Sequence, residues 1–173
     1  MTVAFNQFAE QVRNSRSTKP FIGRLFALDP GETTGWCVWD CRPGEDDYMV
    51  ACGQMPSWPI QHCVRNFQSL LFLYKPTKVV YEQYRVYEWK TDSHSWSDVP
   101  TLRIIGSMET LLLLRNIPYS HQTPQVAKHF VSDDKLKAWN LYEQGQRHSR
   151  DAMRHATYFL CFGEAGHNNR PPQ

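Results

Sequence analysis

The chain has 173 residues, a length that suits one domain with a sizeable core. Its 41% hydrophobic and 13% aromatic content excludes a disordered chain, and no run approaches the ~18 apolar residues of a membrane span. The formal net charge of +2 is nearly neutral, so any binding to nucleic acid has to come from a local basic patch.

Residues 1–20 are expected to form an N-terminal extension with a short amphipathic helix and a polar linker. They lack the basic and then apolar layout of a signal peptide. The five cysteines are an odd number without metal-finger spacing, so we expect reduced thiols in an intracellular protein.

Residues 25–28 are apolar, as in a strand covered on both faces, and Asp29 ends this strand. Pro30 then breaks it, the small residues of 31–35 are predicted to form a turn, and a return strand follows from Trp36. A carboxylate that ends a buried strand needs a neutralising partner, and a metal ion is one solution. An Asp before Pro-Gly is also a common way to begin a turn, so both interpretations stay open.

Residues 48–55 are predicted to add a third strand, which completes an antiparallel meander. An amphipathic helix over 60–74 then leads to a strand over 78–82, which should lie parallel to the first strand. This strand also ends in an acid, so Asp29 and Glu82 should meet at one edge of the sheet. A strand-terminal Glu that simply faces solvent is the alternative.

The loop over 83–98 mixes aromatic rings with cations, which suits contact with nucleic acid because rings stack on bases while cations meet phosphates. The same rings can instead pack on the surface of their own domain. An apolar helix over 100–116 follows, buried either in the core or in a partner.

A strand over 117–121 and a helical turn from Thr123 lead to a lysine cluster, for which a solvated helix face is the alternative. The last helix is expected from 148 or 149 to 162, followed by a polar tail over 164–173. Helical spacing puts His148, Asp151 and His155 on one stripe, with three arginines on the adjacent stripe. An exposed, salt-bridged helix face would show the same pattern.

Together, Asp29, Glu82 and Asp151 offer the oxygen ligands that hard divalent cations prefer. Two such ions about 4 Å apart can activate a water and stabilise the leaving oxygen in phosphodiester hydrolysis. His148 could ligate a metal, orient the water or exchange a proton. The arginine stripe would hold the phosphodiester backbone.

Three motifs occur in a recognisable order: Asp-Pro-Gly-x-x-Thr-Gly after an apolar strand, Val-Val-Tyr-Glu-Gln at the end of a later one, and His-x-x-Asp-Ala near the C-terminus. With this order and spacing, residues 24–162 resemble the RuvC-type Holliday junction resolvases of the RNase H-like (retroviral integrase) superfamily. The small bacteriophage members are the most similar.

The resemblance implies an α/β fold for residues 21–163: an RNase H-like mixed five-stranded sheet, three antiparallel strands followed by parallel strands, flanked by helices. It implies a homodimer through the helix 100–116 that resolves four-way (Holliday) DNA junctions by paired nicks. Two Mg²⁺ or Mn²⁺ ions would serve as cofactors, with no organic cofactor and no membrane. The location would be cytoplasmic, in the host cytoplasm if the chain is phage-encoded.

By the same similarity, the metal ligands and catalytic residues are Asp29, Glu82, His148 and Asp151. The residues expected to contact DNA, from the resemblance and from the basic and aromatic patterns, are Tyr84, Arg85, Tyr87, Lys90, Lys128, Lys135, Lys137, Arg147, Arg150 and Arg154.

Three other functions remain open. A fork, flap or RNA-processing nuclease would use the same acids. The phosphate-cradling hairpin of actin and the sugar kinases is similar, but that fold usually needs several hundred residues. A non-catalytic junction-binding protein is opposed by the three acids, which repel DNA unless metals are present.

Overall fold

The computed structural model describes residues 3–84 and 100–166. In chain order its helices and strands are α1 (Val3–Arg16), β1 (Gly23–Asp29), β2 (Thr33–Cys41), β3 (Tyr48–Pro56), α2 (Ile60–Tyr74), β4 (Lys78–Glu82), α3 (Pro100–Leu114), β5 (Tyr119–Gln122), α4 (Pro124–Phe130), α5 (Asp133–Ala138) and α6 (Arg147–Phe162), followed by a 3₁₀ turn over Gly163–Gly166.

The strands form one mixed sheet in the order β3-β2-β1-β4-β5. The pairs β1–β2 and β2–β3 are antiparallel, whereas β4 runs parallel to both β1 and β5. The predicted α/β fold with three antiparallel strands followed by parallel ones is therefore confirmed.

Some boundaries differ from those expected. Residues 31–35 do not all form the turn, because Thr33 already pairs with Pro56 and Gly35 with Asp29 in the sheet. The helix predicted over 100–116 ends at Leu114, and Asn116 beyond it has a φ of 52°. A positive φ of this kind is a common way to end a helix.

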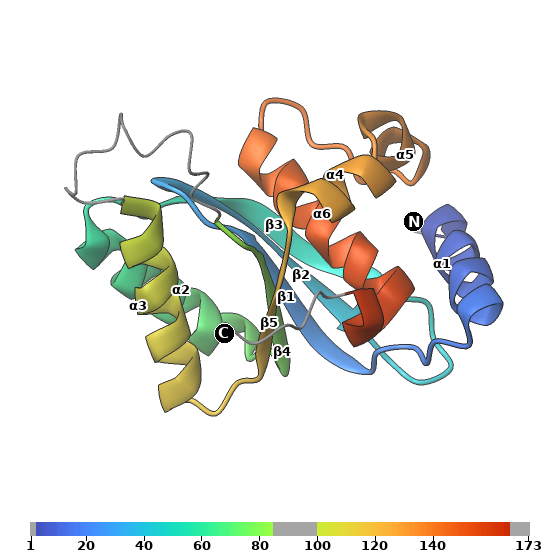
Figure 1. Ribbon diagram of the computed structural model, residues 1–173, viewed down its shortest axis with the longest axis horizontal. Coiled ribbons are helices and arrows are strands. Elements are labelled where there is room, and N and C mark those ends of the chain that lie inside the picture. Colours follow the sequence, from blue (N-terminus) through green and yellow to red (C-terminus); the bar gives the residue numbers. More distant parts are fainter. Residues whose placement is uncertain (1–2, 85–99, 167–173) are drawn as a thin grey trace.

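Helices cover both faces of the sheet (Figure 1). Helices α2 and α3 lie on one face, where Phe26 and Leu28 of β1 join their core. Helix α6 lies on the other face and packs against β1 and β2, with Leu25 and Ala27 in its core. Successive β1 side chains therefore alternate between two apolar layers, as the pleat of a strand requires.

This alternation positions the acids. Asp29 is two residues beyond Ala27 and Glu82 is two residues beyond Val80, and both of these apolar residues belong to the core under α6. Because β1 and β4 are adjacent and parallel, both carboxylates emerge at the same end of the sheet and on the α6 face.

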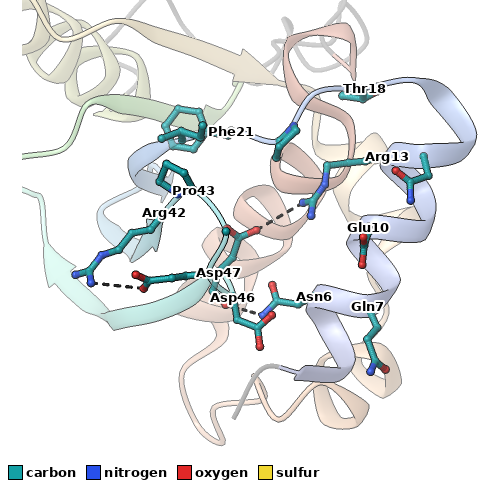
Figure 2. A pocket seen from close by; sticks show the side chains of 15 residues that line it. Asn6, Gln7, Glu10, Arg13, Thr18, Phe21, Arg42, Pro43, Asp46 and Asp47 are labelled. Carbon is teal, nitrogen blue, oxygen red and sulfur yellow. Dashed lines mark hydrogen bonds and ion pairs between the residues drawn. The ribbon is translucent and has the colours of Figure 1, made fainter.

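The N-terminal helix α1 packs against the same core as α6. The Phe5 ring is fully buried, and its centroid lies 5.2 Å from those of both Trp39 and Trp139. Polar contacts hold α1 to the turn after β2: Asn6 donates to the Asp47 carbonyl at 2.9 Å, and Arg13 pairs with the Asp47 carboxylate at 3.6 Å. Figure 2 shows the polar hollow of about 670 Å³ beside these contacts, at the opposite end of β1 from Asp29.

Helix α3 is apolar on more than one side. Ile104, Met108 and Leu112 are buried against the sheet, whereas Leu113 and Leu114 are 64% and 76% exposed. Across residues 3–84 and 100–166, no helix combines the length and the apolar character that crossing a membrane demands.

Candidate active site

Carboxylates from three elements meet beside one ammonium group. Lys128 Nζ, on α4, lies 3.1 Å from Glu82 Oε2 at the end of β4 and 3.5 Å from Asp151 Oδ2 on α6. Those two carboxylate oxygens therefore cannot be farther apart than the sum of these distances. Asp29 joins the group, because its charge interacts with those of Glu82, Asp151 and Lys128. The structure thus brings together the three acids that the sequence predicts.

Asp29 is the most perturbed acid of the cluster. Burial and the neighbouring charge of Glu82, with a further contribution from Asp151, raise the pKa of Asp29 to about 6, although the hydrogen bond with His148 opposes the shift. Burial is the largest cause of this shift, so the charged form of Asp29 is costly unless a positive partner offsets its desolvation.

His148 lies in the first turn of α6, and its Nδ1 is 2.8 Å from Asp29 Oδ2. Gln54 of β3 accepts a hydrogen bond from the His148 backbone N–H at 3.0 Å, which fixes the start of the helix. Gly35 of β2 lies directly under this turn, where the helix backbone leaves no room for a Cβ atom. The sequence predicts His148 at the site, but no sequence pattern identifies Gln54 or Gly35 as its neighbours.

A buried histidine of α6 holds Glu82 in place. His155 Nε2 lies 2.8 Å from Glu82 Oε2, and His155 Nδ1 lies 2.8 Å from Gln122 Oε1. Burial alone would favour the neutral acid, but the hydrogen bond and charge of His155, together with Lys128, lower the pKa of Glu82 below its usual range. The helical stripe placed His155 near the acids, but no sequence signal identified Glu82 or Gln122 as its partners.

Asp151 is held by Arg154, one turn later on α6. The Arg154 guanidinium pairs with both Asp151 and Asp133, and its Nε donates to the Val131 carbonyl at 3.0 Å. Arg154, predicted to contact DNA, is therefore engaged in a network that links α6 to the start of α5.

The side chains at this end of the sheet are of the types that bind a hard divalent cation, since they offer carboxylate oxygens and one imidazole nitrogen. In the structure, the carboxylate oxygens contact Lys128, Arg154, His148 and His155. Among the residues that the structure describes, no three His, Cys, Asp or Glu groups are spaced to hold a metal ion. Lys128 lies between Glu82 and Asp151, where a cation shared by these two carboxylates would bind.

A basic cavity of about 350 Å³ adjoins the acids. It is lined by Asp151, by Lys128 and by residues of α5 and α6 that include Arg147, Arg150 and Arg154. Arg147 is exposed. Arg150 donates to the Glu143 carbonyl at 2.7 Å and lies over the Tyr142 ring at 4.8 Å, so its guanidinium is held in place.

The other residues predicted to contact DNA are scattered. Lys135 donates to the Phe130 carbonyl at 2.6 Å and lies over the Phe130 ring, whereas Lys137 pairs with Asp134 at 3.7 Å. Tyr84 is half-buried, two residues after the end of β4. Arg85, Tyr87 and Lys90 lie outside the described residues.

Comparisons with known proteins bear on this fold. No protein-family model matches the sequence, and no curated protein matches it. The structure is similar to that of Thermus thermophilus RuvC in complex with a Holliday junction substrate, with a TM-score of 0.64 and 13% identity over 83% of this chain and 96% of that one.

Two further similar structures are resolvases. The yeast mitochondrial Holliday junction resolvase Ydc2 has a TM-score of 0.53 and 11% identity, covering 88% of this chain and 84% of that chain. The fowlpox virus Holliday junction resolvase has a TM-score of 0.51 and 12% identity, covering 79% and 97%. The predicted resemblance to the Holliday junction resolvases is therefore confirmed at the level of the fold.

Proposed function

We propose that this chain is a metal-dependent endonuclease that resolves four-way DNA junctions. The observation that carries the proposal is the convergence of Asp29, Glu82 and Asp151 at one end of the sheet. The fold adds support, because the similar structures of Thermus RuvC and the fowlpox resolvase are complexes with Holliday junctions.

In this proposal Asp29, Glu82 and Asp151, with His148, would hold two Mg²⁺ or Mn²⁺ ions. Bound ions of this type activate a water and stabilise the leaving oxygen in phosphodiester hydrolysis. Because His148 Nδ1 contacts Asp29, a ligand role of His148 would use Nε2.

The alternative role for His148 is that of a general base. Its Nδ1 is taken by Asp29, and its side chain is 41% exposed, so Nε2 is the nitrogen that is left to accept a proton from an attacking water. Asp29 then keeps the ring oriented and stabilises the charge that the ring gains.

The basic cavity next to Asp151 would hold the DNA backbone. Arg147 is exposed there, and Arg150 is oriented by Glu143 and Tyr142, so both can meet phosphate oxygens. Lys128 would pair with a phosphate once Glu82 and Asp151 turn to the metal.

A phosphate-cradling hairpin of the actin and sugar-kinase type fits the geometry less well. Thr34 is fully buried, accepts a hydrogen bond from Ser57 at 2.8 Å and donates to the Gly31 carbonyl at 3.0 Å. Gly35 is covered by the first turn of α6. The hairpin between β1 and β2 therefore serves to seat α6.

A homodimer is part of the proposal. Helices α2 and α3 pack together, and their last residues expose a group of large apolar side chains: Phe72, Leu73, Leu113 and Leu114. Exposed apolar groups of this kind favour a protein interface. A second copy joined through α3 would bury them.

Cleavage of a synthetic four-way junction with Mg²⁺ or Mn²⁺ tests the proposed activity. Asp29→Asn should abolish cutting but leave junction binding intact or tighter, because it removes a ligand charge that also repels phosphates. Asp134→Asn is the matched control, since the Asp134 side chain is 93% exposed and pairs with Lys137. Undiminished cutting by Asp29→Asn would remove Asp29 from the mechanism.

The same assay with a fork, a flap and an RNA–DNA hybrid separates the neighbouring activities. Preferred cutting of the four-way junction supports the proposal. Preference for a fork, flap or hybrid identifies one of the other nucleases, and junction binding without any cutting identifies a binding protein.

A further inference from the structure

Gln122 and Glu82 are paired residues on adjacent parallel strands, and His155 of α6 lies between their side chains. His155 and Gln122 are buried, with exposed fractions of 0% and 1%. Neither residue is one of the three acids. His155 nevertheless contacts both Glu82 and Gln122 through its two ring nitrogens. Burying polar groups costs free energy unless each has a hydrogen-bond partner.

The orientation of the Gln122 amide is fixed. Its Nε2 donates to the His155 backbone carbonyl at 3.2 Å, so its Oε1 is the atom that faces His155 Nδ1 at 2.8 Å. A flipped amide would put two acceptor oxygens against each other. Gln122 Oε1 therefore accepts a hydrogen bond from His155 Nδ1–H and fixes the rotation of the imidazole ring.

With its ring fixed in this way, His155 points Nε2 at one oxygen of Glu82. The contact at 2.8 Å engages Oε2, whereas Oε1 meets only the Lys128 ammonium, at 3.4 Å, among the contacts that the structure describes. The ring donates at both nitrogens when it carries two protons. His155 thus holds Glu82 through one carboxylate oxygen, while Lys128 reaches both oxygens, at 3.1 Å from Oε2 and 3.4 Å from Oε1.

We propose that His155 and Gln122 are positioning residues that hold Glu82 in the orientation required to bind a divalent metal ion. This inference rests on the proposed metal-dependent function. Partners that hydrogen-bond a ligating carboxylate typically change metal affinity by about 10- to 100-fold when they are removed.

The test is Mn²⁺ binding, measured without DNA from the electron paramagnetic resonance signal of the free ion. His155→Leu should weaken Mn²⁺ binding by about 10- to 100-fold because Glu82 loses its donor. Gln122→Leu should weaken binding by about 10-fold because the ring is no longer held. His155→Gln should restore most of the affinity, since its amide can still donate to Glu82.

Thr157→Val is the matched control, because Thr157 is fully buried on α6 but donates only to backbone carbonyls of Met153 and Arg154 in the described structure. It should lower the thermal midpoint without changing Mn²⁺ affinity. Unchanged or tighter Mn²⁺ binding by folded Gln122→Leu or His155→Leu would overturn the positioning role while leaving the nuclease proposal intact. A wild-type chain that binds no Mn²⁺ would overturn both.

Discussion

Gly35 of β2 lies so close to His148 of α6 that a Cβ atom on Gly35 would be 1.9 Å from the His148 carbonyl oxygen. This contact joins β2, beside the end of β1, to the first turn of the helix that carries His148 and Asp151. Since the obstructing atoms belong to the backbone, no side-chain rotation can relieve the clash. The site therefore depends on the absence of a side chain at position 35.

We expect Gly35→Ala to displace the start of α6 and to lower the free energy of unfolding by about 3 kcal/mol, the upper part of the range for overpacked sites. Junction cutting should fall more than junction binding, because His148 moves away from Asp29. Gly106→Ala is the control: its Cβ would meet nothing within 4 Å, so the protein should be slightly more stable. Urea unfolding and the junction assay check both variants, and a Gly35→Ala variant as stable as wild type would contradict the prediction.

The raised pKa of Asp29 predicts how stability depends on pH when no divalent metal is present. The folded protein holds the Asp29 proton up to a pKa of about 6, whereas the unfolded chain releases it near the ordinary Asp pKa of 3.8. Between these values the folded state binds more protons, so this group lowers stability as the pH rises. The full effect, about 3 kcal/mol, is reached above pH 6.

Asp29→Asn should remove this destabilisation. In urea unfolding with a chelator present, the variant should gain stability relative to wild type as the pH is raised from 4 to 7. Glu82 and the other acids titrate in both proteins, so the difference reports Asp29 together with its coupling to Glu82 and Asp151. A stability difference that stays constant over this pH range would show that Asp29 is not perturbed.

Lys128 is predicted to compete with a divalent cation. Partial burial disfavours its charge, but Glu82 and Asp151 raise the pKa of Lys128 above its usual value, so the ammonium is bound to the acids that would hold the metal. Lys128→Met should bind Mn²⁺ more tightly than wild type and show a larger rise in thermal midpoint on Mn²⁺ addition. Lys137→Met, at an exposed lysine paired with Asp134, should leave both quantities unchanged. Weaker Mn²⁺ binding by Lys128→Met would mean that Lys128 supports the metal instead of replacing it.

If the chain forms the proposed homodimer, substitutions in the interface should lower its mass in solution. Replacing Leu113 and Leu114 together by Glu should give a folded monomer, because charges at the exposed apolar ends of α2 and α3 oppose their burial. Light scattering coupled to size exclusion measures the mass. Ile22→Glu, at a 58% exposed residue before β1, should leave the dimer unchanged. A monomeric wild-type chain would exclude this interface.

Much of the scaffold could be predicted from local patterns. The alternation of a strand and the position of an acid at its end place Asp29 and Glu82 on one face and at one edge, once β1 and β4 are parallel neighbours. Helical spacing likewise places His148, Asp151 and His155 on one stripe of α6. Periodicity thus determines the face and the end of an element on which a side chain lies.

Periodicity does not determine which side chain of a neighbouring element a residue contacts. Only the tertiary structure decided these partners. Arg154 turns toward Asp133 and the carbonyl of Val131, which a helical wheel cannot anticipate. His155 meets Gln122 because α6 packs over β4 and β5, elements that precede it by dozens of residues. Partners of this kind depend on the distance and angle between packed elements, which many side chains set together and no short stretch of sequence encodes.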